Sequence, residues 1–274
     1  MFRESARRVR VGDFTMNVAV AGAGPPALLL HGFPDSLRLW EAVAPRIAGA
    51  GFQVIAPDLR GFGESDAPVG RRHYAIDRLL GDLTELLRTL QVQGPVHVVG
   101  HDWGAVLGWC LTMSRPDLVR SSVVISVGHP REYALAGLEQ KRKGLYTIGW
   151  QFSGFAERWL THHDHRHMRH WLRQHPDAAG CLRDLARPGR LTAGLNWYRA
   201  NLLPAVLRSW PPCRVPTLGI WGSADHCLAE DQMQRSSRRM EARWRYERIE
   251  DAGHWLPLER PELIAELAVD WLSA

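Results

Sequence analysis

The sequence predicts an α/β protein in which helices cover both faces of a mainly parallel β-sheet. Short apolar runs such as residues 27–30 and 96–99 alternate with longer amphipathic segments, a pattern typical of parallel sheets. The stretch Gly100-His101-Asp102-Trp103-Gly104 directly follows one of these runs and precedes a helical segment. Glycines on both sides of one reactive side chain predict a sharp turn, a nucleophile elbow, at the carboxyl edge of the sheet.

The first half of the chain supplies a hairpin, two buried strands and two helical segments. Residues 9–11 and 14–21 read as strands joined by the turn residues Gly12-Asp13. The continuous apolar run 27–30 predicts a strand that is buried on both faces, and 52–56 reads as another strand. Helical spacing appears twice, in Leu37, Trp40, Val43 and Ile47 and in the leucine-rich segment 76–90.

The second half continues the alternation around one long interruption. A helix over 105–113 should end before Pro116, because proline disfavours helix in the residue ahead of it. Strands are expected at 122–127, 217–221 and 244–249, followed by a closing helix over 261–272. No strand is evident from Arg131 until Pro216. We therefore predict a core formed by 1–130 and 210–274, with 131–209 inserted as a helical lid.

The positive charge of the protein is concentrated in this lid. The chain carries a formal charge of +5, whereas residues 131–209 hold 13 Lys/Arg and 6 Asp/Glu. The basic residues are dispersed and no recognition motif accompanies them, which argues against a nucleic-acid partner. A solvated basic surface is expected, and steering of an anionic ligand or contact with lipid stays open.

The remaining composition predicts a soluble, cytoplasmic protein. The four cysteines have no metal-binding spacing, which fits free thiols in a reducing compartment. Residues 1–12 are charged and lack the apolar core of a signal peptide. No apolar run approaches the roughly 18–20 residues that span a bilayer. Whether the chain is a monomer or a homodimer stays open.

Asp102 occupies the position where an elbow usually presents a serine. A carboxylate can displace a leaving group at an sp³ carbon and form an alkyl ester. Hydrolysis of that ester then needs a base that activates water and donors that stabilise an oxyanion. The alternative is that Asp102 only caps the helix that follows it.

The expected base is His254, which follows the last strand on a loop at the carboxyl edge. Asp225, after the preceding strand, is the best candidate for orienting it, since the order Asp102, Asp225, His254 matches this architecture. Asp251 and Glu250 are rivals, but residues adjacent in sequence rarely face the ring correctly. The backbone N–H groups of Phe33 and Trp103 are the expected oxyanion donors, and Pro34 is a candidate for a cis peptide bond.

Four motifs resemble those of α/β-hydrolase-fold epoxide hydrolases with an aspartate nucleophile, and the resemblance covers nearly the whole chain. They are His31-Gly32-Phe33-Pro34-Asp35-Ser36, Asp58-Leu59-Arg60-Gly61-Phe62-Gly63-Glu64-Ser65, Gly100-His101-Asp102-Trp103-Gly104 and Gly253-His254-Trp255. The resemblance implies an eight-stranded, mostly parallel sheet with a cap. Haloalkane dehalogenases share these motifs, so the motifs alone leave the substrate open.

The lid distinguishes the two activities. Epoxide opening releases an alkoxide, which needs a proton donor beside it, and the resembling enzymes use two lid tyrosines. Tyr146 and Tyr198 match those positions by their local context, whereas Tyr133 at the lid entrance lacks such a context. A dehalogenase would need two halide donors. Trp103 can be one, but Phe33 stands where the family often has the second, an asparagine.

The expected substrate is an apolar aryl or alkyl epoxide, which water converts to a vicinal diol. The apolar pocket that binds it is expected to include Phe33, Pro34, Trp103, Trp150, Phe152 and Trp197. No metal or cofactor is implied. His163 and His167 have a spacing that can bind metal on a helix, but an exposed helix or loop is the favoured interpretation. A scaffold without catalytic activity is the remaining alternative.

Overall fold

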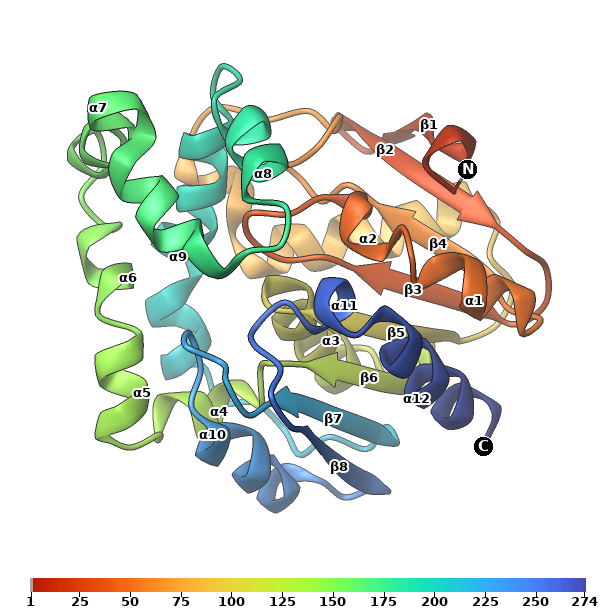
Figure 1. Ribbon diagram of the computed structural model, residues 1–274. Coiled ribbons are helices and arrows are strands. Elements are labelled where there is room, and N and C mark those ends of the chain that lie inside the picture. The colour runs from red at the N-terminus through yellow and green to blue at the C-terminus, as the bar shows by residue number, and fades with distance from the viewer. Residues whose placement is uncertain (1) are drawn as a thin grey trace.

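The computed structural model describes residues 2–274 and contains one eight-stranded sheet with helices on both faces (Figure 1). Its strand order is β1-β2-β4-β3-β5-β6-β7-β8. The strands are β1 (Arg7–Val11), β2 (Phe14–Ala21), β3 (Pro26–Leu30), β4 (Gln53–Pro57), β5 (Val96–His101), β6 (Val119–Ile125), β7 (Thr217–Gly222) and β8 (Trp244–Ile249). Strand β2 pairs antiparallel with β1 and β4, and all other pairs are parallel.

The continuous apolar runs are explained by burial on both faces of the sheet. In β3, Leu28 and Leu30 belong to the apolar core on one face, while Ala27 and Leu29 belong to the core on the other. All four side chains are fully buried. Successive side chains of a strand point to opposite faces, so a central strand needs apolar residues at every position.

Two groups of helices pack against the two faces of the sheet and complete these apolar cores. On one face lie α1 (Ala44–Gly49), α11 (Leu256–Glu259) and α12 (Pro261–Ser273), and on the other lie α2 (Ile76–Thr89), α3 (Trp103–Ser114) and α10 (Glu230–Gln234). The hairpin of β1 and β2, the helix of 76–90 and the closing helix agree with the sequence-based expectations. Segment 37–47 instead splits into a 3₁₀ helix, Leu37–Trp40, and α1.

The strand expected at 122–127 begins and ends earlier than predicted. Val119 already pairs with Val96 of β5, so the neighbouring strand sets the start. The strand ends at Ile125, because Ser126 adopts a φ of 70°, which breaks the extended conformation. Ser126 and the residues after it are thereby released to line the carboxyl edge of the sheet.

Between β6 and β7 the chain forms six α-helices and a short 3₁₀ helix, Leu172–Gln174, over that edge (Figure 1). The α-helices are α4 (Pro130–Ala134), α5 (Leu138–Lys143), α6 (Tyr146–Gly149), α7 (Phe155–Trp171), α8 (Ala178–Leu185) and α9 (Arg190–Leu207). Helix α9 is fastened to the core, because Trp197 Nε1 donates to the carbonyl of Arg60 at 3.0 Å and the N–H of Ile76 donates to Asn201 Oδ1 at 2.7 Å. Within the described part of the chain, no helix is long and apolar enough to cross a membrane.

Candidate active site

Asp102 lies in the turn between β5 and α3, with a φ of 51°. This left-handed conformation is rare for a residue with a side chain and marks a strained turn. Glycines make the turn possible: a Cβ on Gly100 would overlap the carbonyl of Gly104, and a Cβ on Gly104 would overlap that of Leu30. Strands β3 and β5 and helix α3 therefore meet closely beneath Asp102, whose side chain stands above the sheet edge.

His254 and Asp225 are brought to Asp102 from the loops after β8 and β7. His254 Nδ1 lies 2.9 Å from Asp225 Oδ2, and His254 Nε2 lies 3.7 Å from Asp102 Oδ2. His254 and Asp225 are 2% and 3% exposed. The three side chains form an ordered row in which a carboxylate orients an imidazole and the imidazole faces a second carboxylate.

Hydrogen bonds that involve the backbone fix two members of this row, Asp225 and His254. Asp225 Oδ1 accepts from the N–H groups of Cys227 at 2.7 Å and Leu228 at 2.9 Å, so only Oδ2 is left for His254. The carbonyl of His254 accepts from Ser126 Oγ and from His101 Nε2, both at 2.9 Å. The rivals for the acid, Glu250 and Asp251, are exposed. Asp225 is thus the carboxylate that contacts His254.

The electrostatics favour a charged imidazole in the resting site. Burial alone would lower the pKa of His254, but the Asp225 and Asp102 carboxylates outweigh it and raise that pKa to about 10. Burial likewise opposes ionisation of Asp225, yet the charge and hydrogen bond of His254 keep the Asp225 pKa below its ordinary value. His254 therefore carries a proton until one neighbouring negative charge is removed.

The loop after β3 supplies a backbone donor to Asp102. The N–H of Phe33 donates to Asp102 Oδ1 at 2.8 Å, and the Phe33–Pro34 peptide bond is cis, as the sequence led us to expect. His31 braces this loop, because the N–H of Leu59 donates to His31 Nε2 at 2.9 Å. Trp103 is the first residue of α3, where backbone N–H groups have no acceptor within the helix. The two N–H groups expected to form an oxyanion site thus flank Asp102.

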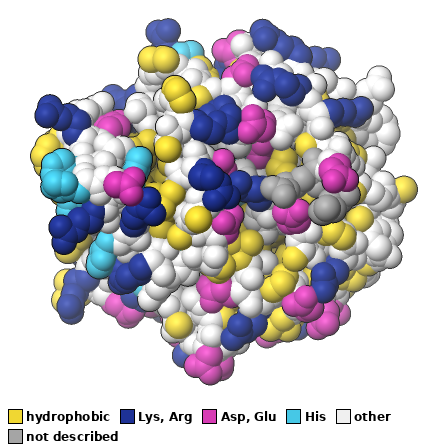
Figure 2. Space-filling model, turned by 45° about the horizontal axis from the view of Figure 1, so that its top comes forward, with side chains coloured by type: hydrophobic (Ala, Val, Ile, Leu, Met, Phe, Trp, Pro, Cys, Tyr) yellow, Lys and Arg dark blue, Asp and Glu magenta, His cyan; other side chains and the backbone are white. Residues whose placement is uncertain are grey.

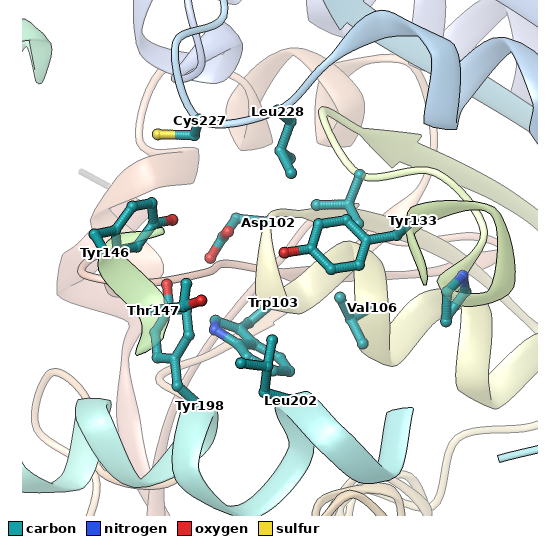
Figure 3. A pocket seen from close by; sticks show the side chains of 12 residues that line it. Asp102, Trp103, Val106, Tyr133, Tyr146, Thr147, Tyr198, Leu202, Cys227 and Leu228 are labelled. Carbon is teal, nitrogen blue, oxygen red and sulfur yellow. The ribbon is translucent and has the colours of Figure 1, made fainter. Parts of the chain in front are cut away.

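A cavity of about 70 Å³ opens above Asp102 (Figure 3). Its walls are Asp102, Trp103, Val106, Val127, Pro130, Tyr133, Tyr146, Thr147, Tyr198, Leu202, Cys227 and Leu228. Most of these side chains are apolar, and the polar atoms are concentrated in the Asp102 carboxylate and a few hydroxyl groups. Ligand pockets of drug-sized molecules are usually several times larger, so the cavity suits a compact apolar ligand.

Tyr146 on α6 and Tyr198 on α9 direct their hydroxyl groups into this cavity near Asp102 (Figure 3). Burial raises the pKa of both phenols well above the ordinary value, with the Asp102 charge acting in the same direction. Both side chains consequently remain protonated, neutral donors over the physiological pH range. Trp150 packs between them, with ring centroids 4.6 Å from Tyr146 and 4.9 Å from Tyr198.

Of the aromatic residues expected in the pocket, only Trp103 lines the cavity directly. The rings of Phe33 and Trp150 pack behind Tyr198, at centroid distances of 5.6 Å and 4.9 Å, and Trp197 packs on Trp103 at 5.9 Å. Pro34 is buried next to them. These side chains form a second layer that supports the cavity wall.

The expectation for Phe152 is wrong. Its side chain is 61% exposed and lies outside the cavity. Between α6 and α7 the chain turns on the outer side of the lid, and Trp150, two residues earlier, takes the buried position instead. Aromatic character alone therefore did not identify which lid residues face the site.

Tyr133, Thr147 and Cys227 line the cavity but were not predicted to do so. Cys227 follows Asp225 by two residues, so its place near the site could have been read from the sequence. Burial raises the pKa of the Cys227 thiol well above the ordinary value, and the Asp225 charge adds to this effect. The thiol consequently stays protonated and is a poor nucleophile next to Asp102.

Two groups of side chains have atoms close enough for a metal ion: Asp35, His175 and Cys181, and Asp225, Cys227 and His254. In the first, the N–H of Asp177 donates to His175 Nδ1 at 2.9 Å, so neutral His175 carries its proton on Nε2. That proton faces Asp35 Oδ1 at 3.2 Å. A ligating histidine normally donates from its other nitrogen, so this geometry favours a hydrogen bond between lid and core over a metal ion. In the second group the carboxylate is already engaged.

His163 and His167 do not converge on one site. Helix α7 is interrupted by non-helical residues from His162 to His165, which breaks the regular spacing between His163 and His167. His163 is exposed, and His167 stacks on Trp159 with ring centroids 4.1 Å apart. Figure 2 shows histidine and Lys/Arg side chains at the same edge of the molecule, together with exposed apolar side chains. The basic lid thus has a solvated outer surface.

Comparison with known proteins agrees with this geometry. Residues 25–261 match the family model described as the alpha/beta hydrolase fold. The chain is 30% identical to "Epoxide hydrolase A" of Mycobacterium tuberculosis, over 97% of both chains. It is 32% identical to "Epoxide hydrolase 3" of Xenopus tropicalis, over 91% of this chain and 71% of the relative. The crystal structure of Epoxide Hydrolase A from Mycobacterium thermoresistibile superimposes with a TM-score of 0.84 at 27% identity, covering 98% of each chain.

Proposed function

The chain belongs to the α/β-hydrolase family, in its epoxide hydrolase branch, and we propose that it adds water to a compact apolar epoxide to give a vicinal diol. The observation that carries this proposal is the arrangement of Asp102 in the elbow, with His254 and Asp225 on one side and the hydroxyl groups of Tyr146 and Tyr198 facing it. The small-molecule substrate and water are the only partners that the reaction requires.

The first half-reaction alkylates Asp102. Oδ2 attacks one carbon of the epoxide ring, and the bond between that carbon and the ring oxygen breaks. Tyr146 and Tyr198 hold the ring oxygen by hydrogen bonds, and one phenol gives it a proton as the alkoxide forms. Oδ1 stays on the Phe33 N–H, from which it already accepts a hydrogen bond of 2.8 Å. The product of this step is an alkyl ester on the enzyme.

The second half-reaction hydrolyses the ester. Alkylation removes the negative charge of Asp102, so the pKa of His254 falls. The imidazole releases its proton, which by way of solvent restores the phenol that became ionised, and His254 can then act as a base. His254 then takes a proton from water, and the hydroxide oxygen adds to Cγ of Asp102. The N–H groups of Phe33 and Trp103 stabilise the negative charge on Oδ1. The bond from Cγ to the alkyl oxygen breaks, His254 passes the proton that it took from water to this oxygen, and the diol leaves. The proton of the new Asp102 carboxyl group then returns to His254.

A single turnover in water labelled with oxygen-18 tests this route. The oxygen that enters the first diol comes from Asp102, so the label should appear in the Asp102 carboxylate and not in the first-turnover product. Label in that product would refute the ester mechanism. The Asp102→Ala variant should form no diol at all.

The alternative of a haloalkane dehalogenase is disfavoured, because the relatives described above are named epoxide hydrolases and Phe33 offers no side-chain donor to a halide. A paired panel of epoxides and haloalkanes tests this directly: diol without halide release is the expected outcome. A cytoplasmic location is a further proposal, supported by four cysteines that are all free.

A further inference from the structure

Tyr133 is a third phenol in the cavity, and the proposed reaction leaves it without a task. It lies on α4, at the start of the lid, whereas Tyr146 and Tyr198 lie on α6 and α9. In Figure 3 the hydroxyl groups of Tyr133 and Tyr146 point toward Asp102 from opposite sides of the cavity. Two phenols hold the ring oxygen in the proposed mechanism, so the third faces another part of the ligand.

The Tyr133 hydroxyl has no hydrogen-bond partner among the described residues. The side chain lines the cavity. A ligand that displaces water from the cavity leaves this hydroxyl unpaired unless it brings a polar atom to it, and an unpaired hydroxyl in an apolar site is unfavourable. A polar atom of a bound ligand would satisfy it.

The wall around Tyr133 is otherwise apolar and close. Val106, Val127, Pro130 and Leu228 line the same cavity, which measures about 70 Å³. Apolar pockets of this kind use a few placed polar groups to orient and select the ligand. The ligand that matches this wall is a short substituent with one hydrogen-bond acceptor.

We infer that Tyr133 is a specificity-determining residue whose hydroxyl donates to an acceptor oxygen on the substituent of the epoxide. The preferred substrates are then small epoxides with an ether or hydroxyl oxygen in the side arm, rather than pure hydrocarbons. This inference rests on the proposed function. It adds no step to the reaction, because Tyr133 binds the side arm and leaves the ring oxygen to Tyr146 and Tyr198.

A matched pair of substrates tests the inference. Glycidyl methyl ether and 1,2-epoxypentane have the same chain length and differ by one ether oxygen in place of a methylene group. In the Tyr133→Phe variant, kcat/KM for the ether should fall about fivefold to tenfold, mostly through KM, the size expected for one neutral hydrogen bond. The value for 1,2-epoxypentane should stay within about twofold. Tyr133→Leu, which also removes the oxygen, should shift the ratio in the same direction.

Tyr246→Phe is the matched control. The Tyr246 hydroxyl donates a hydrogen bond of 2.8 Å to Glu230, and neither residue lines the cavity. Its ratio of the two kcat/KM values should equal that of the unmodified protein. An unchanged ratio in both Tyr133 variants would overturn the inference and leave the proposed function standing. An equal loss for both substrates would also overturn it, since Tyr133 would then act on the epoxide ring. Absence of diol from every epoxide with the unmodified protein would instead reject the proposed function.

Discussion

The Nε2 atom of His254 faces Oδ2 of Asp102 across 3.7 Å, so the charge of the nucleophile acts directly on the base. Together with Asp225, that charge raises the pKa of His254 to about 10 against the effect of burial. In the resting enzyme the imidazole is therefore protonated at neutral pH. Formation of the ester neutralises Asp102 and makes the base available at the stage where water must be activated.

Asp102→Asn should lower the pKa of His254, because the substitution removes one of the two negative charges that raise it. The imidazole would then lose its proton at a lower pH than in the unmodified protein. Titration of the His254 ring by nuclear magnetic resonance measures the midpoint. Asp251 is an exposed carboxylate three residues before His254, so Asp251→Asn is the control and should leave the titration midpoint of His254 unchanged. An identical midpoint in Asp102→Asn would show that the nucleophile does not set the charge of the base.

His254→Gln should trap the alkyl ester, because alkylation of Asp102 does not use the imidazole whereas hydrolysis of the ester does. Incubation with substrate should increase the mass of the intact protein by the mass of one epoxide, and peptide mapping should locate it on Asp102. The double variant with Asp102→Ala should gain no mass. A His254→Gln enzyme that turns over at the original rate would exclude His254 as the base.

Tyr146→Phe and Tyr198→Phe should each slow alkylation about 10²-fold, since each removes one donor to the developing alkoxide. Hydrolysis of the ester should be affected far less, because the former ring oxygen is by then a hydroxyl group and takes no part in that step. Rapid-mixing measurements on single turnovers separate the two rates. Equal slowing of both steps in either variant would argue for a structural rather than a chemical role of that tyrosine.

Arg60 and Asp82 form a buried ion pair that should dominate the stability of the turn after β4. Arg60 Nε and one terminal nitrogen bond the two Asp82 oxygens, both at 2.7 Å, with Arg60 only 1% exposed. Asp82→Ala leaves the buried guanidinium with only a longer contact, 3.3 Å, to Asp13 Oδ1, and should reduce the free energy of unfolding by about 3 kcal/mol. Urea denaturation measures this change.

Arg88 and Glu85 form an exposed ion pair on α2, the helix that also carries Asp82, and this pair provides a matched control. Glu85→Ala should leave the urea midpoint nearly unchanged, because exposed ion pairs contribute little. Since the carbonyl of Arg60 also accepts from Trp197 of the lid, Asp82→Ala should in addition weaken the attachment of α9. A small effect of Asp82→Ala on stability would contradict the assignment of this pair as the anchor.

The sheet and the row from Asp102 to Asp225 were predictable because their signals are local. A strand such as β3 is apolar at every position since both of its faces are covered, and the glycines around Asp102 permit one sharp turn. The loops after β7 and β8 begin at the same sheet edge, because the two strands are parallel neighbours, so chain order could predict that Asp225 and His254 lie close together.

The lid was less predictable, because packing against other elements decides which of its side chains face the site. Phe152 and Trp150 are two residues apart and both aromatic, yet one is exposed and the other supports the cavity. Tyr133 lacks a motif and reaches the cavity only because α4 starts directly after the edge of β6. The positions of such residues depend on contacts that no short stretch of sequence encodes.

The hydrogen bond between Asp35 in the core and His175 in the lid limits which chimeras can be made by combining the lid of this protein with the core of a relative. Asp35 lies two residues after Phe33, and its N–H closes a turn by donating to the carbonyl of Gly32. His175 lies in the connection between α7 and α8. A lid transplanted onto another core brings a buried imidazole that requires a carboxylate in that turn. Chimeras should therefore exchange Asp35 and His175 as a unit, and lids moved without this pair should fold onto a foreign core less tightly.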